Sequence, residues 1–341
     1  MPFAPRVSVV LPVFNGHQTL GKALDSIRNQ TLQEWELVVV DDGSTDGTAE
    51  TLAFYQAREP RLRLVRQPHT GIVAALNAGL KAAQARLIAR MDADDEAFPD
   101  RLEMQADFLD RHPDIGVAGC LVEFGGCAMR AAGYALHVDW VNSLLSPESI
   151  EINRFVEAPL AHPSVMFRAE LPERHGGYRE GPFPEDYELW LRWMEAGVKF
   201  GKVNRTLLRW NDPPQRLSRA DARYSTEAFY RCKAGYLARW LRAHLAPPRP
   251  IWIWGAGRPT RKRAEWLASH GVSIAGYVDI DPRKQGRRLG GGREVVAPED
   301  LPPAGEIFVL GYVGKRAARS LARNLLAARG WLEGRDFLMA A

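Results

Sequence analysis

Short apolar runs alternate with helix-patterned segments along the first 125 residues of this chain. Residues 7–13 (VSVVLPV) and 37–40 (LVVV) are rich in aliphatic and β-branched residues, as is typical of strands buried on both faces. Leu20, Leu24 and Ile27 follow the first run at the spacing of one helix face. The alternation predicts an α/β fold whose mostly parallel sheet is flanked by helices and binds ligands at the carboxyl ends of its strands.

A second α/β pattern follows a proline cluster. Residues 246–250 (APPRP) cannot continue the helical segment that precedes them. After them come a predicted strand at 251–254, a glycine-rich turn and a basic helix from Arg258. We therefore predict a first domain at residues 1–216, a helical connector with a Pro-rich linker at 217–250, and a smaller Rossmann-like α/β domain at 251–341.

The composition excludes several classes of protein. A length of 341 residues suits two domains, and 46% hydrophobic with 25% charged residues argues against extended disorder. No apolar run reaches the roughly 18 to 20 residues of a membrane-spanning helix. The three cysteines form no close pair, so neither a disulfide framework nor a zinc site is expected. With no secretory signal at the N-terminus, we expect a cytoplasmic protein.

Charge divides the chain into an acidic and a basic part. Residues 1–204 carry 20 Lys and Arg against 29 Asp and Glu, whereas residues 205–341 carry 25 against 12. A basic half could contact nucleic acid, an anionic membrane or the acidic half itself. Because its charges are spread over helix-like segments, we expect a solvated or docking face. We predict no nucleic-acid partner. We also predict that the basic half contacts the inner face of an anionic membrane peripherally.

Carboxylates follow the second predicted strand. The loop at residues 41–48 (DDGSTDGT) is acidic, so it suits hydrogen bonds from base N–H or ribose hydroxyl groups better than phosphate. Capping of the next helix is the alternative for this loop. Two adjacent aspartates, Asp41 and Asp42, at a buried strand end favour ligand contact over capping alone.

Two further acidic motifs are candidates for the chemistry. Asp92 and Asp94, after the fourth predicted strand, can present hard oxygen ligands to one Mg²⁺ or Mn²⁺, or form a solvated turn. Glu185 and Asp186 open a predicted helix, where the helix dipole alone would place acidic residues. In the functional interpretation, Asp186 is a general base kept ionised by the helix N-terminus.

Four motifs together resemble the inverting glycosyltransferases of family 2, which have the GT-A fold of nucleotide-diphospho-sugar transferases. The motifs, in order, are residues 9–16 (VVLPVFNG), 30–48 (with VVVDDGSTDGT), 90–102 (RMDADD and PDRL) and 185–192 (EDYELWLR). The likeness covers roughly residues 5–220.

The resemblance implies metal-dependent transfer of a sugar, with inversion, from a nucleotide-diphospho-sugar to a carbohydrate or lipid-linked acceptor. The expected donor is a UDP-sugar, and the expected setting is synthesis of cell-surface polysaccharide or glycan. Among the implied donor-binding residues, Pro12, Val13 and Phe14 would line the nucleobase pocket and Asp42 would bond the base. Asp41 and Asp92 would also contact the donor, Asp92 near the ribose or the metal. Asp94 with Asp92 would hold Mn²⁺ or Mg²⁺, and Asp186 would deprotonate the acceptor. Glu185 and His162 would lie on the acceptor side, although His162 suits a structural role equally well.

Two positions depart from the family pattern. Asn211 or Asp212 falls where many relatives have a metal-binding His, so the third metal ligand stays open. Leu76 stands where relatives often have an Arg that contacts the donor.

Two rival functions remain open. The turn Gly255-Ala256-Gly257 is similar to a dinucleotide-binding turn, but Pro259 and Thr260 break that pattern, which favours docking or regulation. A catalytically silent sugar-nucleotide or dinucleotide sensor is therefore one rival. A nucleotidyltransferase is the other, although the first loop lacks the basic residue that such enzymes usually place there.

Overall fold

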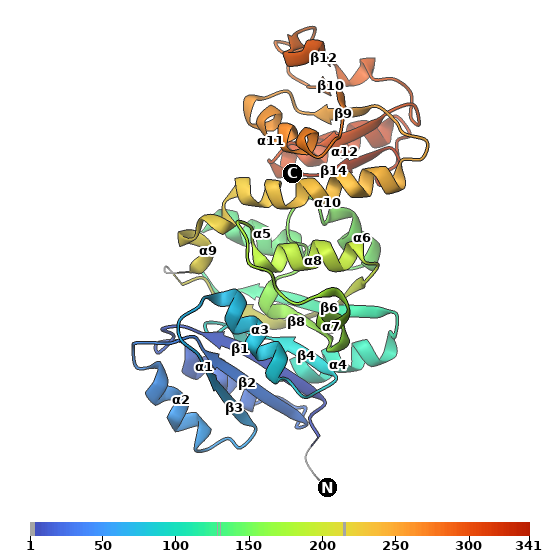
Figure 1. The fold of residues 1–341 in the computed structure, drawn as a ribbon. Helices are drawn as coiled ribbons and strands as arrows, with labels where there is room; N and C mark the ends of the chain where they lie inside the picture. Colours follow the sequence, from blue (N-terminus) through green and yellow to red (C-terminus); the bar gives the residue numbers. More distant parts are fainter. Residues whose placement is uncertain (1–3, 128, 130, 214–215) are drawn as a thin grey trace. The chain divides into compact units, whose positions relative to one another are not determined.

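The computed structural model describes residues 4–127, 129, 131–213 and 216–341, and contacts group them into two compact units. The first unit takes residues up to Ile150, Pro159–Gly181 and Arg192–Asp221. The second takes Glu151–Ala158, Pro182–Leu191 and Ala222–Ala341. Both are mixtures of helices and strands, which confirms the predicted α/β class (Figure 1).

The first unit is built on one sheet with the strand order β3-β2-β1-β4-β7-β6-β8-β5. Its strands are β1 (Val7–Val13), β2 (Trp35–Asp41), β3 (Leu62–Arg66), β4 (Leu87–Arg90), β5 (Glu96–Ala97), β6 (Ile115–Phe124), β7 (Met166–Arg168) and β8 (Lys199–Trp210). Its helices are α1 (Leu20–Arg28), α2 (Thr48–Gln56), α3 (Ile72–Ala82), α4 (Arg101–Arg111), α5 (Ala132–Ser143) and α7 (Glu170–His175), with short turns η1 (His162–Ser164) and α9 (Leu217–Ala220). Helix α6 (Pro147–Asn153) continues into the second unit.

The predicted parallel pattern holds in one half of this sheet. β1 pairs in parallel with β2 and β4, and β2 pairs in parallel with β3. Every residue of β1 and β2 is buried, as expected for apolar strands that helices cover on both faces. In the other half, β6 and β8 are parallel, but β7 is antiparallel to both β4 and β6, and β5 is antiparallel to β8. The irregular sequence of residues 120–202 did not predict these pairings.

The second unit has a smaller sheet with the order β11-β12-β10-β9-β13-β14. Its strands are β9 (Ile251–Trp254), β10 (Ile274–Val278), β11 (Arg288–Leu289), β12 (Arg293–Val296), β13 (Phe308–Gly311) and β14 (Phe337–Met339). Its helices include α10 (Thr226–His244), α11 (Arg258–Ser269) and α12 (Arg316–Ala328), with turns η2 (Ala222–Tyr224), η3 (Gly290–Gly292) and η4 (Pro298–Asp300). Apart from the antiparallel β11, the strands follow the 3-2-1-4-5 order of doubly wound folds.

Helix α8 (Glu185–Glu195) begins in the second unit and ends in the first. Its residues Tyr187 and Leu191 share a hydrophobic core with Leu237 of α10, Ile253 of β9 and Phe308 of β13. The two units group residues by their packing contacts. The predicted domain boundaries at residues 216 and 250 are a different division of the chain, and they stay a prediction. Among the described residues, no helix has both the length and the apolar character needed to cross a membrane.

Candidate active site

Three of the predicted site residues lie at one edge of the first sheet. The register pairs Val13, the last residue of β1, with Asp41, the last residue of β2. Beyond β4, the main-chain N–H of Met91 donates to the carbonyl oxygen of Val10 at 3.1 Å, which holds the next residue, Asp92, at the same edge. The carboxyl ends of parallel strands are where α/β sheets bind ligands.

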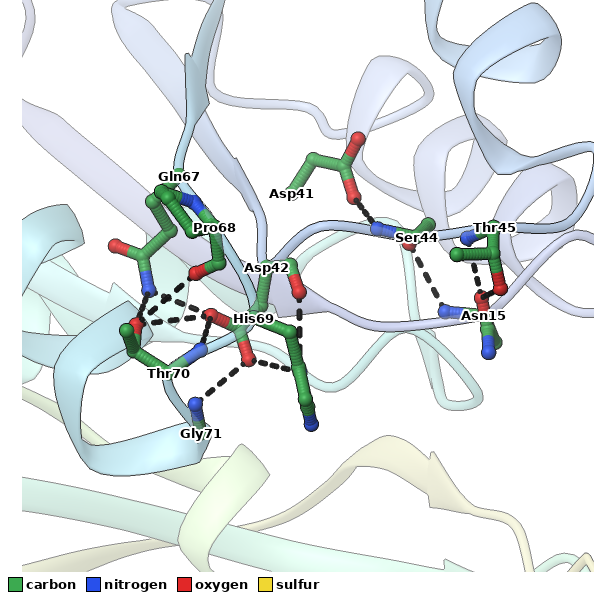
Figure 2. A network of polar contacts seen from close by, with 10 residues as sticks. All are labelled: Asn15, Asp41, Asp42, Ser44, Thr45, Gln67, Pro68, His69, Thr70 and Gly71. Atoms are coloured by element: carbon green, nitrogen blue, oxygen red, sulfur yellow. Dashed lines mark hydrogen bonds and ion pairs between the residues drawn. The ribbon is translucent and has the colours of Figure 1, made fainter.

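Asp42 organises the loop that follows β3. Its Oδ1 accepts hydrogen bonds from Gln67 Nε2 at 2.6 Å and from the Thr70 main-chain N–H at 3.0 Å. Its Oδ2 accepts from the Gly71 N–H at 2.9 Å and lies 2.8 Å from His69 Nδ1 (Figure 2). Burial opposes ionisation of this carboxyl, but the bonds from Thr70, Gln67 and Gly71 bring its pKa below the ordinary value. Because both oxygens of this 3%-exposed residue already have donors, contact between Asp42 and a nucleobase stays a prediction.

Asp41 has a simpler set of contacts. Its Oδ1 accepts the Ser44 N–H at 3.0 Å, and no other donor is recorded for this carboxylate among the described residues. Ser44 Oγ in turn accepts the Asn15 N–H at 2.9 Å, which ties the loop after β1 to the loop after β2 (Figure 2). Asp41 therefore keeps an acceptor oxygen that a ligand could use.

An aromatic pair lies beside this loop network. The ring of Phe14, which is 45% exposed, stacks on the ring of His69 with 3.9 Å between centroids and 20° between planes. Phe14 was predicted to line the nucleobase pocket, together with the buried Pro12 and Val13. His69 was not predicted, because the contact joins segments 55 residues apart and leaves no sequence pattern.

The acidic residues after β4 form a compact cluster. Asp92, Asp94 and Asp95 each offer a carboxylate oxygen, and these three atoms lie within 4.8 Å of one another. Asp95 is 1% exposed; its Oδ1 accepts the Asn211 N–H at 2.8 Å, whereas its buried Oδ2 has no hydrogen-bond partner among the described residues. A buried, unpartnered carboxylate oxygen between two other carboxylates fits a divalent cation that prefers oxygen ligands. Asp95 was not predicted as a ligand, although it directly follows the Asp-x-Asp pattern.

Burial and repulsion between the carboxylates raise the pKa of two members of this cluster. Burial, and then the charge of Asp92, raises the pKa of Asp94 to about 6. Burial and the charges of Asp92 and Asp94 raise the pKa of Asp95 well above its ordinary value. A bound dication would offset this repulsion and favour the ionised carboxylates.

The segment after β8 contacts the acidic cluster. Asn211 Nδ2 donates to the main-chain oxygen of Asp94 at 2.7 Å, so this side chain braces the loop. Asp212 instead forms an ion pair with Arg219 at 2.5 Å and lies outside the cluster. Whether either residue binds a metal stays a prediction, and Asp95 is the third carboxylate that the geometry offers.

Arg216 adds a positive charge near the cluster. Its guanidinium lies over the rings of Tyr134 and Trp210, 4.6 and 4.7 Å from their centroids, and one of its nitrogens donates to Tyr134 Oη. The positive charge of Arg216 lowers the pKa of Asp94, against the larger effects of burial and Asp92. At the other departure from the family pattern, Leu76 is fully buried in α3 and offers no charge to a ligand.

In the second unit, the predicted base lies between two carboxylates that tyrosines hold. Tyr224 Oη donates to Glu185 Oε1 and Oε2 at 2.8 and 2.7 Å, and Tyr236 Oη donates to Glu188 Oε1 at 2.6 Å. Asp186 Oδ1 accepts the Tyr187 N–H at 2.7 Å. The tyrosine partners lie 39 and 48 residues further along the chain and were not predicted.

His162 is buried in η1 of the first unit. Its Nε2 lies 2.8 Å from Tyr178 Oη, and burial followed by the charge of Arg90 lowers its pKa well below the ordinary value. The imidazole is therefore neutral and has a structural partner. A role for His162 on the acceptor side stays a prediction.

Residues of the second unit contact the turn after β9 closely. Gly255 has a φ of 110°, and a Cβ there would lie 3.0 Å from Val313 Cγ1. Asp279, after β10, accepts the Ala256 N–H at 2.8 Å and pairs with Lys284 at 2.9 Å. Nucleotide binding at this turn stays a prediction.

Comparison with known proteins identifies a family and several relatives of this chain. The family described as Glycosyl transferase family 2 matches residues 8–160. EpsE of Bacillus subtilis (strain 168), which is named as a glycosyltransferase, is 31% identical over 233 residues, or 67% of this chain and 80% of EpsE. The amylovoran biosynthesis glycosyltransferase AmsE of Erwinia amylovora is 31% identical over 208 residues, or 59% of this chain and 74% of AmsE.

Solved structures share the fold. The crystal structure of S. aureus TarS residues 1–349 aligns with a TM-score of 0.53 at 18% identity, over 78% of this chain and 70% of that one. The mannosyltransferase PcManGT of Pyrobaculum calidifontis, solved with GDP-Man and Mn²⁺, aligns with a TM-score of 0.51 at 21% identity, over 79% and 74% of the two chains.

Proposed function

Because the chain belongs to glycosyltransferase family 2, we propose that it moves a sugar, with inversion, from a UDP-sugar to an acceptor hydroxyl and needs a divalent cation to do so. The observation that carries the proposal is the trio Asp92, Asp94 and Asp95, with the orphaned Oδ2 of Asp95, at the sheet edge that also bears Asp41. A parallel-sheet edge with this donor set suits a nucleotide diphosphate and its cation.

The nucleoside end of the donor would lie at the loops after β1 and β2. Phe14 offers an exposed ring for contact with the base, and the stacking of His69 on that ring holds it in place. Asp41 offers a carboxylate oxygen to a base N–H or a ribose hydroxyl. Asp42 supports these groups indirectly, because it holds residues 67–71 in position.

The diphosphate end would lie at the acidic trio. Asp92, Asp94 and Asp95 would hold Mn²⁺ or Mg²⁺, which as a Lewis acid neutralises the charge that develops on the leaving diphosphate. Asn211 fixes the main chain of this loop, and Arg216 supplies a further positive charge beside it.

The proton of the acceptor would go to Asp186. The acceptor oxygen forms a bond to the anomeric carbon as the bond from that carbon to the diphosphate breaks, and the acceptor proton passes to the carboxylate. One such displacement inverts the anomeric centre without a second carboxylate nucleophile. Glu185 is the less suitable base, because both of its oxygens accept the hydroxyl of Tyr224.

Polysaccharide or glycan synthesis is the proposed setting. AmsE is named for amylovoran biosynthesis, and the relative WbnJ of Escherichia coli, 26% identical over 241 residues, is named for O-antigen biosynthesis. We propose a cytoplasmic location with peripheral membrane contact through the basic C-terminal half, where Arg258 and Lys262 of α11 are exposed. Flotation with vesicles of anionic lipid, compared with vesicles of neutral lipid, would test that contact.

A screen of donors tests the proposed function. The full-length protein is incubated with UDP- and GDP-sugars, with and without Mn²⁺, and release of the nucleoside diphosphate is measured. We expect release from at least one UDP-sugar and only with the cation. Release from GDP-sugars alone would reject the UDP assignment, and release without any cation would reject metal dependence.

A further inference from the structure

Three neighbouring side chains in α8 are tied to different parts of the second unit. Glu185 accepts the hydroxyl of Tyr224 from η2, and Glu188 accepts the hydroxyl of Tyr236 from α10. Tyr187 Oη donates to the carbonyl oxygen of Arg154 at 2.8 Å, and its ring lies against Phe229 of α10 with 5.1 Å between centroids. Glu185 is the direct chain neighbour of Asp186, whereas Glu188 lies two residues beyond it.

The tie at Glu185 acts closest to Asp186. Glu185 is 3% exposed, and the Tyr224 hydroxyl donates to both of its carboxylate oxygens, so this hydrogen bond helps to stabilise the buried charge. Burial, followed by the charges of Glu185 and Asp186, raises the pKa of the Tyr224 phenol, which therefore remains a donor at neutral pH. Tyr224 thus faces the negative charge of both residues that open the helix.

Successive residues of a helix project about 100° apart. With Glu185 directed toward Tyr224, the side chain of Asp186 is committed to a different direction by the helix itself. Loss of the Tyr224 hydroxyl would remove a hydrogen bond that both oxygens of this buried carboxylate accept, and with it one restraint on the direction of the Glu185 side chain. A shift of Glu185 would disturb the first turn of α8, where Asp186 lies.

We propose that Tyr224 is a positioning residue for the transfer reaction: by binding Glu185, it fixes the direction in which Asp186 presents its carboxylate to the acceptor. The inference rests on the proposed function, because it assumes that Asp186 is the base. It adds a part of the chain outside all four sequence motifs to the catalytic machinery.

The test compares Tyr224→Phe with Tyr236→Phe in the full-length protein. Both variants lose one phenol-to-carboxylate hydrogen bond in the same unit, so a general loss of stability would affect them alike. For Tyr224→Phe we expect kcat for donor turnover to fall about tenfold or more, the scale of a lost hydrogen bond to a charged group, with unchanged donor KM and UDP affinity. For Tyr236→Phe we expect kcat within about twofold of wild type.

The double variant Tyr224→Phe/Glu185→Gln tests the route of the effect. Because it removes the charge that Tyr224 would otherwise satisfy, it should recover part of the kcat lost in Tyr224→Phe. Equal kcat in Tyr224→Phe and wild type, or equal losses in both tyrosine variants, would overturn the positioning role. A Glu185→Gln variant as inactive as Asp186→Asn would also overturn it, because Glu185 would then be the base. A wild type that turns over no nucleotide sugar would instead remove the proposed function, and this inference with it.

Discussion

The side-chain amide of Asn211 donates a hydrogen bond to the main-chain oxygen of Asp94 at 2.7 Å. The main-chain N–H of the same residue donates to Asp95 Oδ1 at 2.8 Å. Two bonds from the end of β8 therefore hold the loop after β4, although the two segments are more than 110 residues apart in sequence. They leave the second oxygen of Asp95 for a different partner, and a divalent cation is the partner that its surroundings suit.

Asp95→Asn should therefore separate metal binding from folding. The amide keeps the shape of the side chain but removes one of three repelling charges, so we expect the melting temperature without metal to stay level or rise. Mn²⁺ affinity should fall at least about tenfold, because a carboxylate ligand is lost. Mn²⁺ titration and thermal unfolding measure the two effects. Asp100→Asn, which breaks the ion pair with Arg205 at 2.7 Å, is the control and should leave Mn²⁺ affinity unchanged.

Metal affinity should depend on pH through Asp94. Its pKa of about 6 in the metal-free protein is raised, so the carboxyl takes up a proton as the pH falls through 6 and must lose it to bind the cation. We expect Mn²⁺ affinity to fall by at least about tenfold per pH unit below pH 6, because Asp95, whose pKa is also raised, must lose its proton as well. Titration with Mn²⁺ at several pH values checks this, and an affinity that stays constant down to pH 5 would contradict it.

Mutation of Asp42 should lower the stability of the protein more than mutation of Asp41. Asp42→Ala removes an acceptor for at least four donors, so we expect the free energy of unfolding to fall by about 2 kcal/mol and nucleotide affinity to fall with it. Asp41→Asn should weaken UDP binding with little change in stability, because Asp41 accepts one recorded bond. Denaturant unfolding and calorimetry with UDP distinguish the two. The reverse pattern would mean that Asp42 binds the base directly.

Asp186→Asn should lower turnover by at least about 10²-fold and leave UDP affinity nearly unchanged. The amide keeps the shape and helix-capping capacity of the side chain but cannot take the acceptor proton. Glu185→Gln is measured in parallel, because both residues open α8. If only Glu185→Gln is inactive, the base is Glu185; if both variants remain active, the acidic pair serves the helix terminus alone.

The sequence predicted the parallel strands β1 to β4, because their apolar runs alternate regularly with helix-patterned segments. β1 and β2 are continuous apolar runs, and such runs suit strands covered on both faces wherever they occur. β7 has three residues within a stretch rich in Gly and Pro, so its antiparallel pairing depends on neighbours that no local pattern reveals.

The candidate site divides in the same way. Asp41, Asp42, Asp92 and Asp94 were predicted because they follow strands whose ends meet at one edge of the sheet. Sequence spacing cannot reveal contacts between residues 25 or more positions apart, such as the bond from Gln67 to Asp42 and the bond from Tyr224 to Glu185. It also cannot show that Asp95 Oδ2 is buried without a hydrogen-bond partner among the described residues. In α8, Leu189, Trp190 and Trp193 are fully buried. Tyr187 and Leu191 are also buried, because they belong to the core of the second unit.

Calorimetry with UDP, with and without Mn²⁺, tests the central claim most directly, because it requires neither the sugar nor the acceptor to be known. For the wild-type protein we expect UDP to bind at least about tenfold more tightly when Mn²⁺ is present. For Asp94→Ala we expect one weak affinity under both conditions, because the cation loses a ligand from the trio. Equal UDP affinity of the wild type with and without Mn²⁺ would contradict a metal-dependent donor site at Asp92, Asp94 and Asp95.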